Sequence, residues 1–184
     1  DQVTLKNLHE KQKWGKTILK PAVSAGARDT FKLSSDNLNK FEDDFQNLIS
    51  KECMMLQPFQ KDIIEHGEVS YVLFGGEFSH AVLKQAKKGD FRVQDDFGGT
   101  AELYKPNHEE INFAETVVKA CNPLPTYARV DVIRDNNRNL CLVELELLEP
   151  ELWFRYHPES ANIFTNHLLN YIKKLLKLII DYTD

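Results

Sequence analysis

The sequence predicts an α+β fold with mostly antiparallel strands and with helices packed on one side. Two hairpin patterns indicate this fold: strand-like segments flank Gly75–Gly76, and a second pair flanks the polar turn Asp135–Asn139. The third observation is helical periodicity, because apolar residues recur every three or four positions in Leu38–Ile49 and in Ile111–Val118. A chain of 184 residues with this mixture is expected to form one domain or two small lobes that share a cleft.

The first third of the chain predicts two strands and a helix. Lys16–Pro21 is a short apolar strand that ends at a proline, and Val23–Thr30 is a loop of small residues. Ser34 or Ser35 is expected to cap the helix that follows, and Met54–Phe59 to form the second strand. The predicted buried face of this helix comprises Leu38, Phe41, Phe45, Leu48 and Ile49.

The middle of the chain predicts a hairpin and a second helix. Gly67–Phe74 turns back at paired glycines into Glu77–Lys84, which is a hairpin by pattern and by turn chemistry. A helix is expected to start at Asn107 or His108 and to run through Cys121. Its predicted buried stripe comprises Ile111, Ala114, Val117 and Val118.

The last helix follows Pro158, and its segment Leu168–Ile180 is apolar but interrupted by three lysines. This is the pattern of an amphipathic helix, so core packing is expected, with a face for a homo-oligomer as the alternative. No apolar run is long enough to cross a bilayer, and no signal peptide is recognised. A membrane partner is therefore not expected.

Composition narrows the function classes. The formal charge of −5 and the pI near 5.7 argue against a general nucleic-acid binder, which would show a basic face. The three cysteines, Cys53, Cys121 and Cys141, have no metal-ligand spacing, so buried free thiols are expected. Free thiols indicate a reducing compartment, which predicts a cytoplasmic protein.

Three acidic residues of the second hairpin form the sharpest candidate site. Glu144 and Glu146 are two apart on one strand and share a face, and pairing can bring Asp131 of the preceding strand beside them. Three such carboxylates would raise one another's pKa unless a cation sat between them, and oxygen ligands suit Mg²⁺ or Mn²⁺. The alternative is the solvated face of an antiparallel sheet, which alternating Glu residues commonly form.

Cations next to glycine-bearing loops are the second candidate. Lys20 precedes the small-residue loop, whose backbone N–H groups can approach phosphate oxygens, although an ordinary turn has the same composition. Arg92 lies in a polar loop between glycines, where a solvated arginine is the alternative. His80 and His108 are expected to be structural or solvated, since no Cys–His or Ser–His arrangement is recognised.

Six short motifs together resemble one family. The chain is similar, over residues 18–164, to the nucleotide-binding part of an ATP-grasp carboxylate–amine ligase, on the branch of bacterial glutathione synthetase and ribosomal-protein glutamate ligase. Each motif alone is nonspecific, and their shared order is what carries the resemblance. In order they are Leu19–Pro21 with its small-residue loop, Leu56–Phe59, Gly67–Ser70, Gly89–Arg92 with Gly98–Gly99, Ala128–Asp131 and Glu144–Glu146.

The resemblance implies a fold and a division of the chain. The implied fold has two α+β lobes with mostly antiparallel sheets that grip ATP between them. Residues 17–59 would form the smaller lobe with the phosphate loop, and residues 60–184 the larger lobe with the metal site and the last helix. Residues 1–16 would be a lead-in from a missing amino-terminal domain.

The resemblance also implies nucleotide contacts. Lys20 would contact the phosphates, and Glu68 would hold the ribose hydroxyls. The flexible loop that closes over the phosphates would include Ser24, Ala25, Gly26 and Arg28. The hinge that reads the adenine would comprise Gln57, Pro58 and Phe59.

The implied reaction activates a carboxylate as an acyl phosphate, which an amine then attacks, with release of ADP and phosphate. Arg92, Lys84 and Arg129 would be the catalytic cations, and the cofactors would be ATP and Mg²⁺ or Mn²⁺. The metal ligands would be Asp131, Glu144 and Glu146. The family commonly has Asn where this chain has Glu146, so its metal site is more acidic.

The implied substrates are a small-molecule carboxylate and a small-molecule amine. Two other readings of the sequence stay open: a non-catalytic nucleotide-binding module that regulates a partner, and a small-molecule kinase of the same fold.

Overall fold

The computed structural model describes residues 3–23, 26–87, 89, 93 and 98–181. The chain forms two compact units, Asp1–Gln60 and Lys61–Asp184. Each unit combines helices with an antiparallel sheet, so the predicted α+β class is confirmed.

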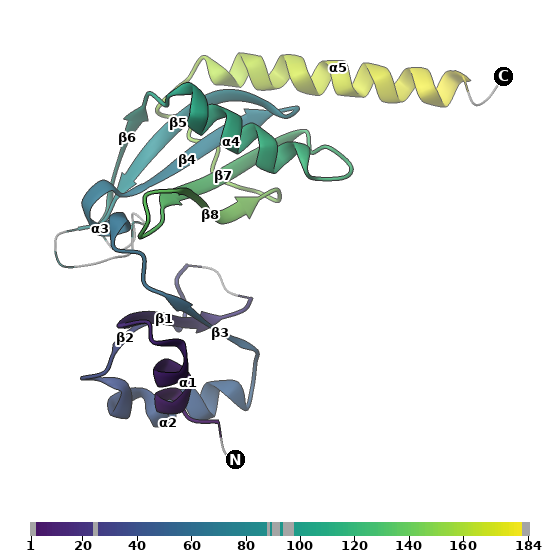
Figure 1. The fold of residues 1–184 in the computed structure, drawn as a ribbon. Coiled ribbons are helices and arrows are strands. Elements are labelled where there is room, and N and C mark those ends of the chain that lie inside the picture. Colours follow the sequence, from purple (N-terminus) through teal and green to yellow (C-terminus); the bar gives the residue numbers. More distant parts are fainter. Residues whose placement is uncertain (1–2, 24–25, 88, 90–92, 94–97, 182–184) are drawn as a thin grey trace. The chain divides into compact units, whose positions relative to one another are not determined.

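The first unit is a three-stranded sheet with two helices (Figure 1). The strand order is β2-β1-β3, and both pairings are antiparallel. The elements are α1 (Leu5–Gln12), β1 (Lys16–Pro21), β2 (Phe31–Ser34), α2 (Leu38–Ile49) and β3 (Met54–Pro58). One hydrophobic core joins both helices to the sheet, and its buried members are Leu5, Leu19, Leu33, Leu38 and Phe45.

Two details of this unit differ from the sequence prediction. Neither Ser34 nor Ser35 caps α2, because Ser34 ends β2 and the residue before the helix is Asn37. The Asn37 side chain accepts a hydrogen bond from the Ser34 N–H and donates to the Lys32 carbonyl, which builds the turn instead. Ile49 is exposed rather than buried, since α2 ends there.

The second unit is a five-stranded antiparallel sheet in the order β6-β5-β4-β7-β8. Both predicted hairpins are present, and the β4–β5 turn places Gly75 and Gly76 at positive φ, where glycine is tolerated best. The elements are α3 (Asp62–His66), β4 (Glu68–Phe74), β5 (Glu77–Gln85), β6 (Thr100–Tyr104), α4 (His108–Lys119), β7 (Tyr127–Arg134), β8 (Leu140–Glu146) and α5 (Ser160–Asp181).

Helix α4 covers one face of this sheet (Figure 1). Asn107 caps it, as predicted, through a reciprocal capping box with Glu110. Ala114 and Val118 are fully buried against the sheet, whereas Ile111 and Val117 are half-buried. The core under α4 contains Tyr71, Leu73, Ala81, Ala128, Val130 and Val132.

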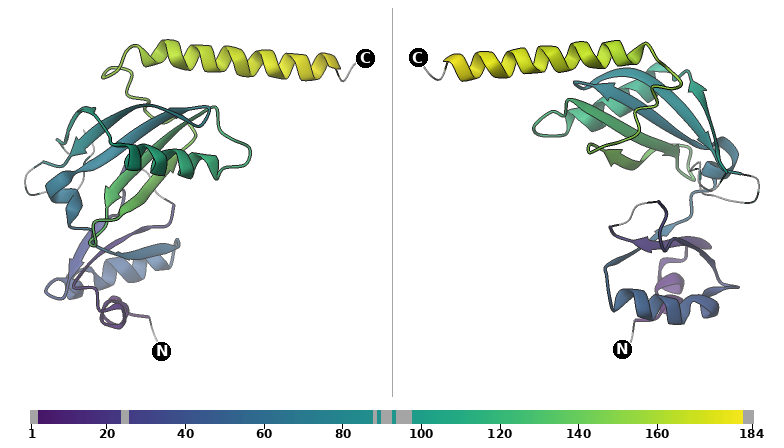
Figure 2. Two further views of the ribbon diagram at one scale, coloured as in Figure 1. Left: turned by 45° about the horizontal axis from the view of Figure 1, so that its top comes forward. Right: turned by 180° about the vertical axis from the view of Figure 1, so that it is seen from behind.

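The segment between β8 and α5 crosses the opposite face (Figure 2, right). Trp153 of this segment is buried against Val72, Phe74 and Val82. The His80 ring, on β5, contacts the Leu152 carbonyl through Nε2 at 3.0 Å, and it stacks on His157 with ring centroids 5.1 Å apart. His80 is thus a buried structural residue that holds this crossing segment, as expected.

Strand β8 contains an irregularity in its pairing with β7. Val132 faces Leu142 and Asp131 faces Glu144, so Val143 is an extra residue, a β-bulge. The bulge shifts the alternation of β8 by one, so that Leu140 and Leu145 both pack toward the core under α4. Glu144 and Glu146 therefore point to the other face.

Two expectations about the surface are wrong. Most apolar side chains of α5 do not pack into a core; near the start of the helix, Phe164 and His167 lie against Phe74 of the sheet. The exposed large apolar side chains of α5 are Ile163, Leu169, Tyr171, Ile172, Leu175 and Leu176. The cysteines are free but not buried, because Cys53 is exposed and the other two are half-buried. No described helix is both long and apolar enough to span a bilayer.

Candidate functional site

A cluster of charged side chains occupies one face of the second unit's sheet. Glu68 of β4 pairs with Lys84 of β5, and Asp131 of β7 is the cross-strand neighbour of Ser70 on one side and of Glu144 on the other. Because residues two apart share a face of a strand, four strands bring their polar side chains together. The charged members of this cluster are Glu68, Lys84, Arg129, Asp131, Glu144 and Glu146.

Asp131 is the buried centre of the cluster, with 1% of its surface exposed. Its Oδ1 accepts hydrogen bonds from the Ser70 hydroxyl at 2.6 Å and from Arg129 Nε at 3.1 Å. Its Oδ2 accepts from Lys84 Nζ at 2.9 Å and from Arg129 Nη2 at 3.0 Å. A buried carboxylate needs such partners, and both of its oxygens have them.

Lys84 lies between two carboxylates, since it forms ion pairs with both Glu68 and Asp131. Burial alone would lower the pKa of Lys84, but the two carboxylates raise it, so the ammonium is retained. Burial also acts against ionised Asp131, yet Lys84, Arg129 and Ser70 lower its pKa. Burial raises the pKa of Glu68, and the charge of Asp131 adds to the rise, although Lys84 and Arg129 lower it.

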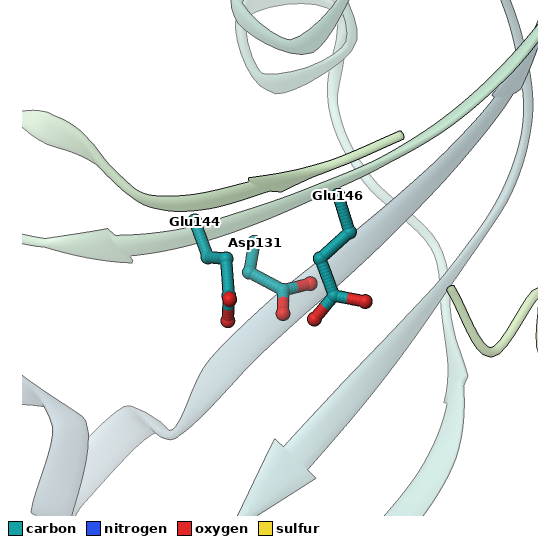
Figure 3. Close-up of side chains that lie close together, drawn as sticks. All are labelled: Asp131, Glu144 and Glu146. Atoms are coloured by element: carbon teal, nitrogen blue, oxygen red, sulfur yellow. The ribbon is translucent and has the colours of Figure 1, made fainter. Parts of the chain in front are cut away.

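The three acids of the second hairpin do converge, as the sequence predicts. One oxygen each of Asp131, Glu144 and Glu146 can be chosen so that all lie within 4.8 Å of one another. Figure 3 shows the three carboxylates projecting from the same face of β7 and β8. Glu144 is exposed and Glu146 is half-buried, so the group is buried at Asp131 and open at Glu144.

The carboxylate oxygens fit a hard divalent cation, which prefers oxygen ligands. Burial raises the pKa of Glu146, and Glu144 and Asp131 add to the rise, while Arg129 opposes it. The pKa of Asp131 is lowered instead, because the cations Lys84 and Arg129 lie beside that carboxylate. Lys84 and Arg129 are thus counter-ions of the acids in this structure.

Predicted site residues of the first unit lie on β1, β3 and the loop after β1. Lys20 is half-buried on β1, opposite Met55. Arg28 donates to both oxygens of Glu52 at 2.8 Å, and these hydrogen bonds raise the pKa of Arg28. Gly26, in the same loop, has a positive φ of 60°. This loop is therefore tied to the end of α2 by an ion pair.

Gln57 and Pro58 end β3, and Phe59 follows them. The Phe59 N–H donates to the Lys16 carbonyl at 2.9 Å, so this backbone group has a hydrogen-bond partner within the first unit. The Phe59 ring is buried under the Lys32 ammonium, whose nitrogen lies 3.8 Å from the ring centroid. Three other predicted site residues, Ser24, Ala25 and Arg92, lie outside the described residues.

Sequence reasoning missed Ser70 as a member of the cluster. Its hydroxyl is fully buried and donates to Asp131. The signal was available, because Ser70 stands two residues after Glu68 and so shares its face of β4.

Comparison with known proteins identifies the fold. Residues 1–146 match the family described as the prokaryotic glutathione synthetase ATP-grasp domain. The chain belongs to this family. The resemblance stated from the six motifs is thereby confirmed, as is the ATP-grasp fold. No curated protein matches the chain.

Solved structures similar to this ATP-grasp domain are ligases. D-cycloserine synthetase DcsG has a TM-score of 0.75 at 20% identity, over 90% of this chain and 59% of that one. The D-alanine–D-alanine ligase of Bacillus anthracis, complexed with ATP, has a TM-score of 0.60 at 18% identity, over 99% and 59%. The ATP-grasp ligase PsnB, complexed with minimal precursor, Mg and ADP, has 0.59 at 13%, over 89% and 49%. The ATP-grasp domain thus spans half to three fifths of the length of these chains.

Proposed function

We propose that this ATP-grasp domain is the nucleotide- and metal-binding part of a ligase that joins a carboxylate to an amine at the expense of ATP. The observation that carries the proposal is the set of three carboxylates within 4.8 Å, beside fixed cations, in a chain of this family. Asp131, Glu144 and Glu146 would hold Mg²⁺ or Mn²⁺, whose charge would offset that of the nucleotide phosphates.

The chain's own residues would supply charge stabilisation and positioning. Phosphoryl transfer to a carboxylate requires the negative charge that moves between oxygens to be balanced, which is mainly an electrostatic task. Lys84 and Arg129 are cations of the described cluster, and we assign Arg92 to the same task from its motif. The acyl phosphate would then react with the amine without a covalent nucleophile on the protein.

The first unit would bind the nucleotide as the smaller lobe, residues 17–59, and residues 60–184 would form the larger lobe. We assign Lys20 and the loop with Ser24, Ala25, Gly26 and Arg28 to the phosphates. Gln57, Pro58 and Phe59 are assigned to the adenine, and Glu68 to the ribose. Structures of two similar ligases support a nucleotide site, since they contain ATP in one case and Mg with ADP in the other.

The substrates of the proposed ligase are a small-molecule acid and a small-molecule amine. A cytoplasmic location and the lack of nucleic-acid and membrane partners stay predictions from composition. A homo-oligomer through α5 also stays a prediction.

Calorimetric titration with a non-hydrolysable ATP analogue, with and without Mg²⁺, tests the proposal. The expected result is Mg²⁺-dependent binding that Glu144→Gln weakens at least about tenfold, because one charged ligand is lost. Glu109→Gln is the matched control: this exposed glutamate lies on α4, which covers the opposite face of the sheet, and binding should not change. Nucleotide binding that is indifferent to Mg²⁺ and to Glu144→Gln would contradict the metal assignment.

Product analysis separates the ligase from the other readings. With acids and amines supplied to the full-length protein, a ligase releases ADP and phosphate only when both substrates are present. A kinase gives a stable phosphorylated product without an amine, and a regulatory module gives no turnover.

A further inference from the structure

The guanidinium of Arg129 connects two of the three candidate metal ligands. Nε and Nη2 donate to the Asp131 carboxylate at 3.0–3.2 Å, and Nη2 also forms an ion pair with Glu146 Oε1. The side chain is 11% exposed, so this geometry is fixed within the cluster. A planar guanidinium suits such double contacts better than an ammonium does.

Glu146 therefore has two possible cationic partners, Arg129 and a divalent metal ion. Its carboxylate is one of the three groups that converge on the candidate metal site, and it is also the second partner of Arg129. A divalent ion held by Glu146 and Asp131 would lie within a few ångströms of the guanidinium. Like charges at that distance repel strongly in a partly buried site, so the ion and Arg129 cannot both keep their closest contacts with Glu146.

Charge counting points the same way. The described cluster has four carboxylates, Glu68, Asp131, Glu144 and Glu146, against two cations, Lys84 and Arg129, which gives a formal charge of −2. One divalent ion balances this charge. Without the ion, Arg129 neutralises the half-buried carboxylate of Glu146.

We propose that Arg129 is a positioning residue that exchanges with the divalent cation on Glu146. In the absence of the ion, Arg129 bridges Asp131 and Glu146 and keeps both carboxylates in place. When the ion binds, Arg129 releases Glu146 and remains paired with Asp131. This inference rests on the proposed function, because it assumes that the three carboxylates hold a metal. It adds that the site itself supplies a cation that competes with the ion.

The competing explanation is that Arg129 only orients the carboxylates. The two accounts predict opposite changes in metal affinity when the Arg129 side chain is removed. A competitor that is removed leaves Glu146 available, so metal affinity rises. An orienting group that is removed leaves the ligands disordered, so metal affinity falls.

A double-mutant cycle on Mn²⁺ affinity decides between them, with free Mn²⁺ measured by electron paramagnetic resonance and no nucleotide present. Arg129→Met is expected to bind Mn²⁺ about tenfold more tightly than the unchanged protein. In the Glu146→Gln background the same change should alter affinity less than about threefold, because the contested carboxylate is gone. Circular dichroism of each variant checks folding; Asp131 keeps Lys84 and Ser70 as partners.

A second measurement uses the unchanged protein and does not depend on how a variant folds. The Arg129 Nη–H resonances, assigned by their loss in Arg129→Lys or Arg129→Met, are followed by nuclear magnetic resonance during Mg²⁺ titration, because Nη2 is the atom that donates to Glu146. Exchange predicts a saturable shift and faster hydrogen exchange of Nη2–H as the Glu146 contact breaks, whereas Nε–H stays bonded to Asp131.

Three outcomes are distinct. Tighter Mn²⁺ binding in Arg129→Met that depends on Glu146 supports the exchange. Weaker binding, an equal change in both backgrounds, or Nη–H signals unmoved by saturating Mg²⁺ overturns it but leaves the proposed ligase intact, since the metal still binds. No Mn²⁺ binding by any variant overturns both the exchange and the metal site of the proposed function.

Discussion

Asp131 and Glu144 are both acids of the candidate site, but their surroundings give them different roles in stability. Asp131 is buried and hydrogen-bonded to Lys84, Arg129 and Ser70, whereas Glu144 is exposed. The stability of a buried charge and its counter-ions depends on every partner, because removal of one leaves the charges of the others uncompensated. An exposed carboxylate is solvated by water in any case.

Neutralising these two acids should therefore separate stability from metal binding. Asp131→Asn is expected to lower the free energy of unfolding by about 3 kcal/mol, because Lys84 and Arg129 lose their shared partner. Glu144→Gln should change it by less than about 0.5 kcal/mol. Urea denaturation in the presence of a chelator measures both. Equal losses in the two variants would contradict the burial argument.

At the scale of single residues, the sequence predicted the converging acids well and their environment poorly. Period-two spacing placed Glu144 and Glu146 on one face, and hairpin pairing placed Asp131 beside them. The spacing does not reveal that Lys84 contacts the same carboxylate as Arg129. The Lys84 contact depends on the order β5-β4-β7-β8, which joins strands far apart in the sequence.

The segment between β8 and α5 has no regular secondary structure, yet it packs across one face of the sheet. Its position depends on Trp153, on the His80 contact with the Leu152 carbonyl and on the stacking of His80 against His157. Burial, with a smaller effect from His157, lowers the pKa of His80 to about 4, although the Leu152 carbonyl acts in the opposite direction.

This segment should make the second unit acid-sensitive. Below pH 6.5 the unfolded chain protonates His80, whereas the folded chain does so only near pH 4, so stability falls as the pH is lowered through this window. The expected loss is on the order of 2 kcal/mol. It should disappear from the unfolding free energy of His80→Gln, measured by urea denaturation at each pH. His108→Gln, which removes an exposed histidine at the start of α4, should keep the pH dependence of the unfolding free energy seen in the unchanged protein.

Long elements with strong periodicity were predicted correctly, whereas some short or polar ones, among them β2 and α1, were missed. The strand β2 has four residues, too few to show alternation, and α1 has a polar sequence in which only Leu5 and His9 are buried. Helix α5 shows the converse case. Its amphipathic pattern identifies the helix correctly, but periodicity alone does not say what covers its apolar side chains.

Each of the two compact units has hydrophobic clusters of its own. Leu19 belongs to the cluster of Asp1–Gln60, and Leu73 belongs to a cluster of Lys61–Asp184. Both leucines are essentially inaccessible to water. Units with separate cores can unfold separately, with free energies that differ between them.

Matched leucine substitutions test this independence. Leu19→Ala and Leu73→Ala are each expected to lower the unfolding free energy of their own unit by about 3 kcal/mol, through lost burial and a new cavity. Hydrogen exchange read by mass spectrometry resolves the two units. If either substitution lowered protection equally in both units, the chain would unfold as a single cooperative body.

At the scale of the whole molecule, the fold was predictable because six weak motifs occur in a fixed order, and the family match over residues 1–146 confirms it. The sequence could predict which candidate site residues lie close together only within the second unit. In that unit the register of the sheet determines which side chains are neighbours.

The bulge at Val143 also determines where the chain tolerates a change of length. Loss of Val143 would leave Leu142 opposite Val132 and Glu144 opposite Asp131, because those pairs already flank the extra residue. Loss of Leu145 would instead move Glu146 opposite Val130, on the opposite face from Glu144. Related sequences are therefore expected to differ by a one-residue gap at position 143 and to keep an unbroken strand from 144 to 146, so the bulge is where alignments of such chains should be allowed to open.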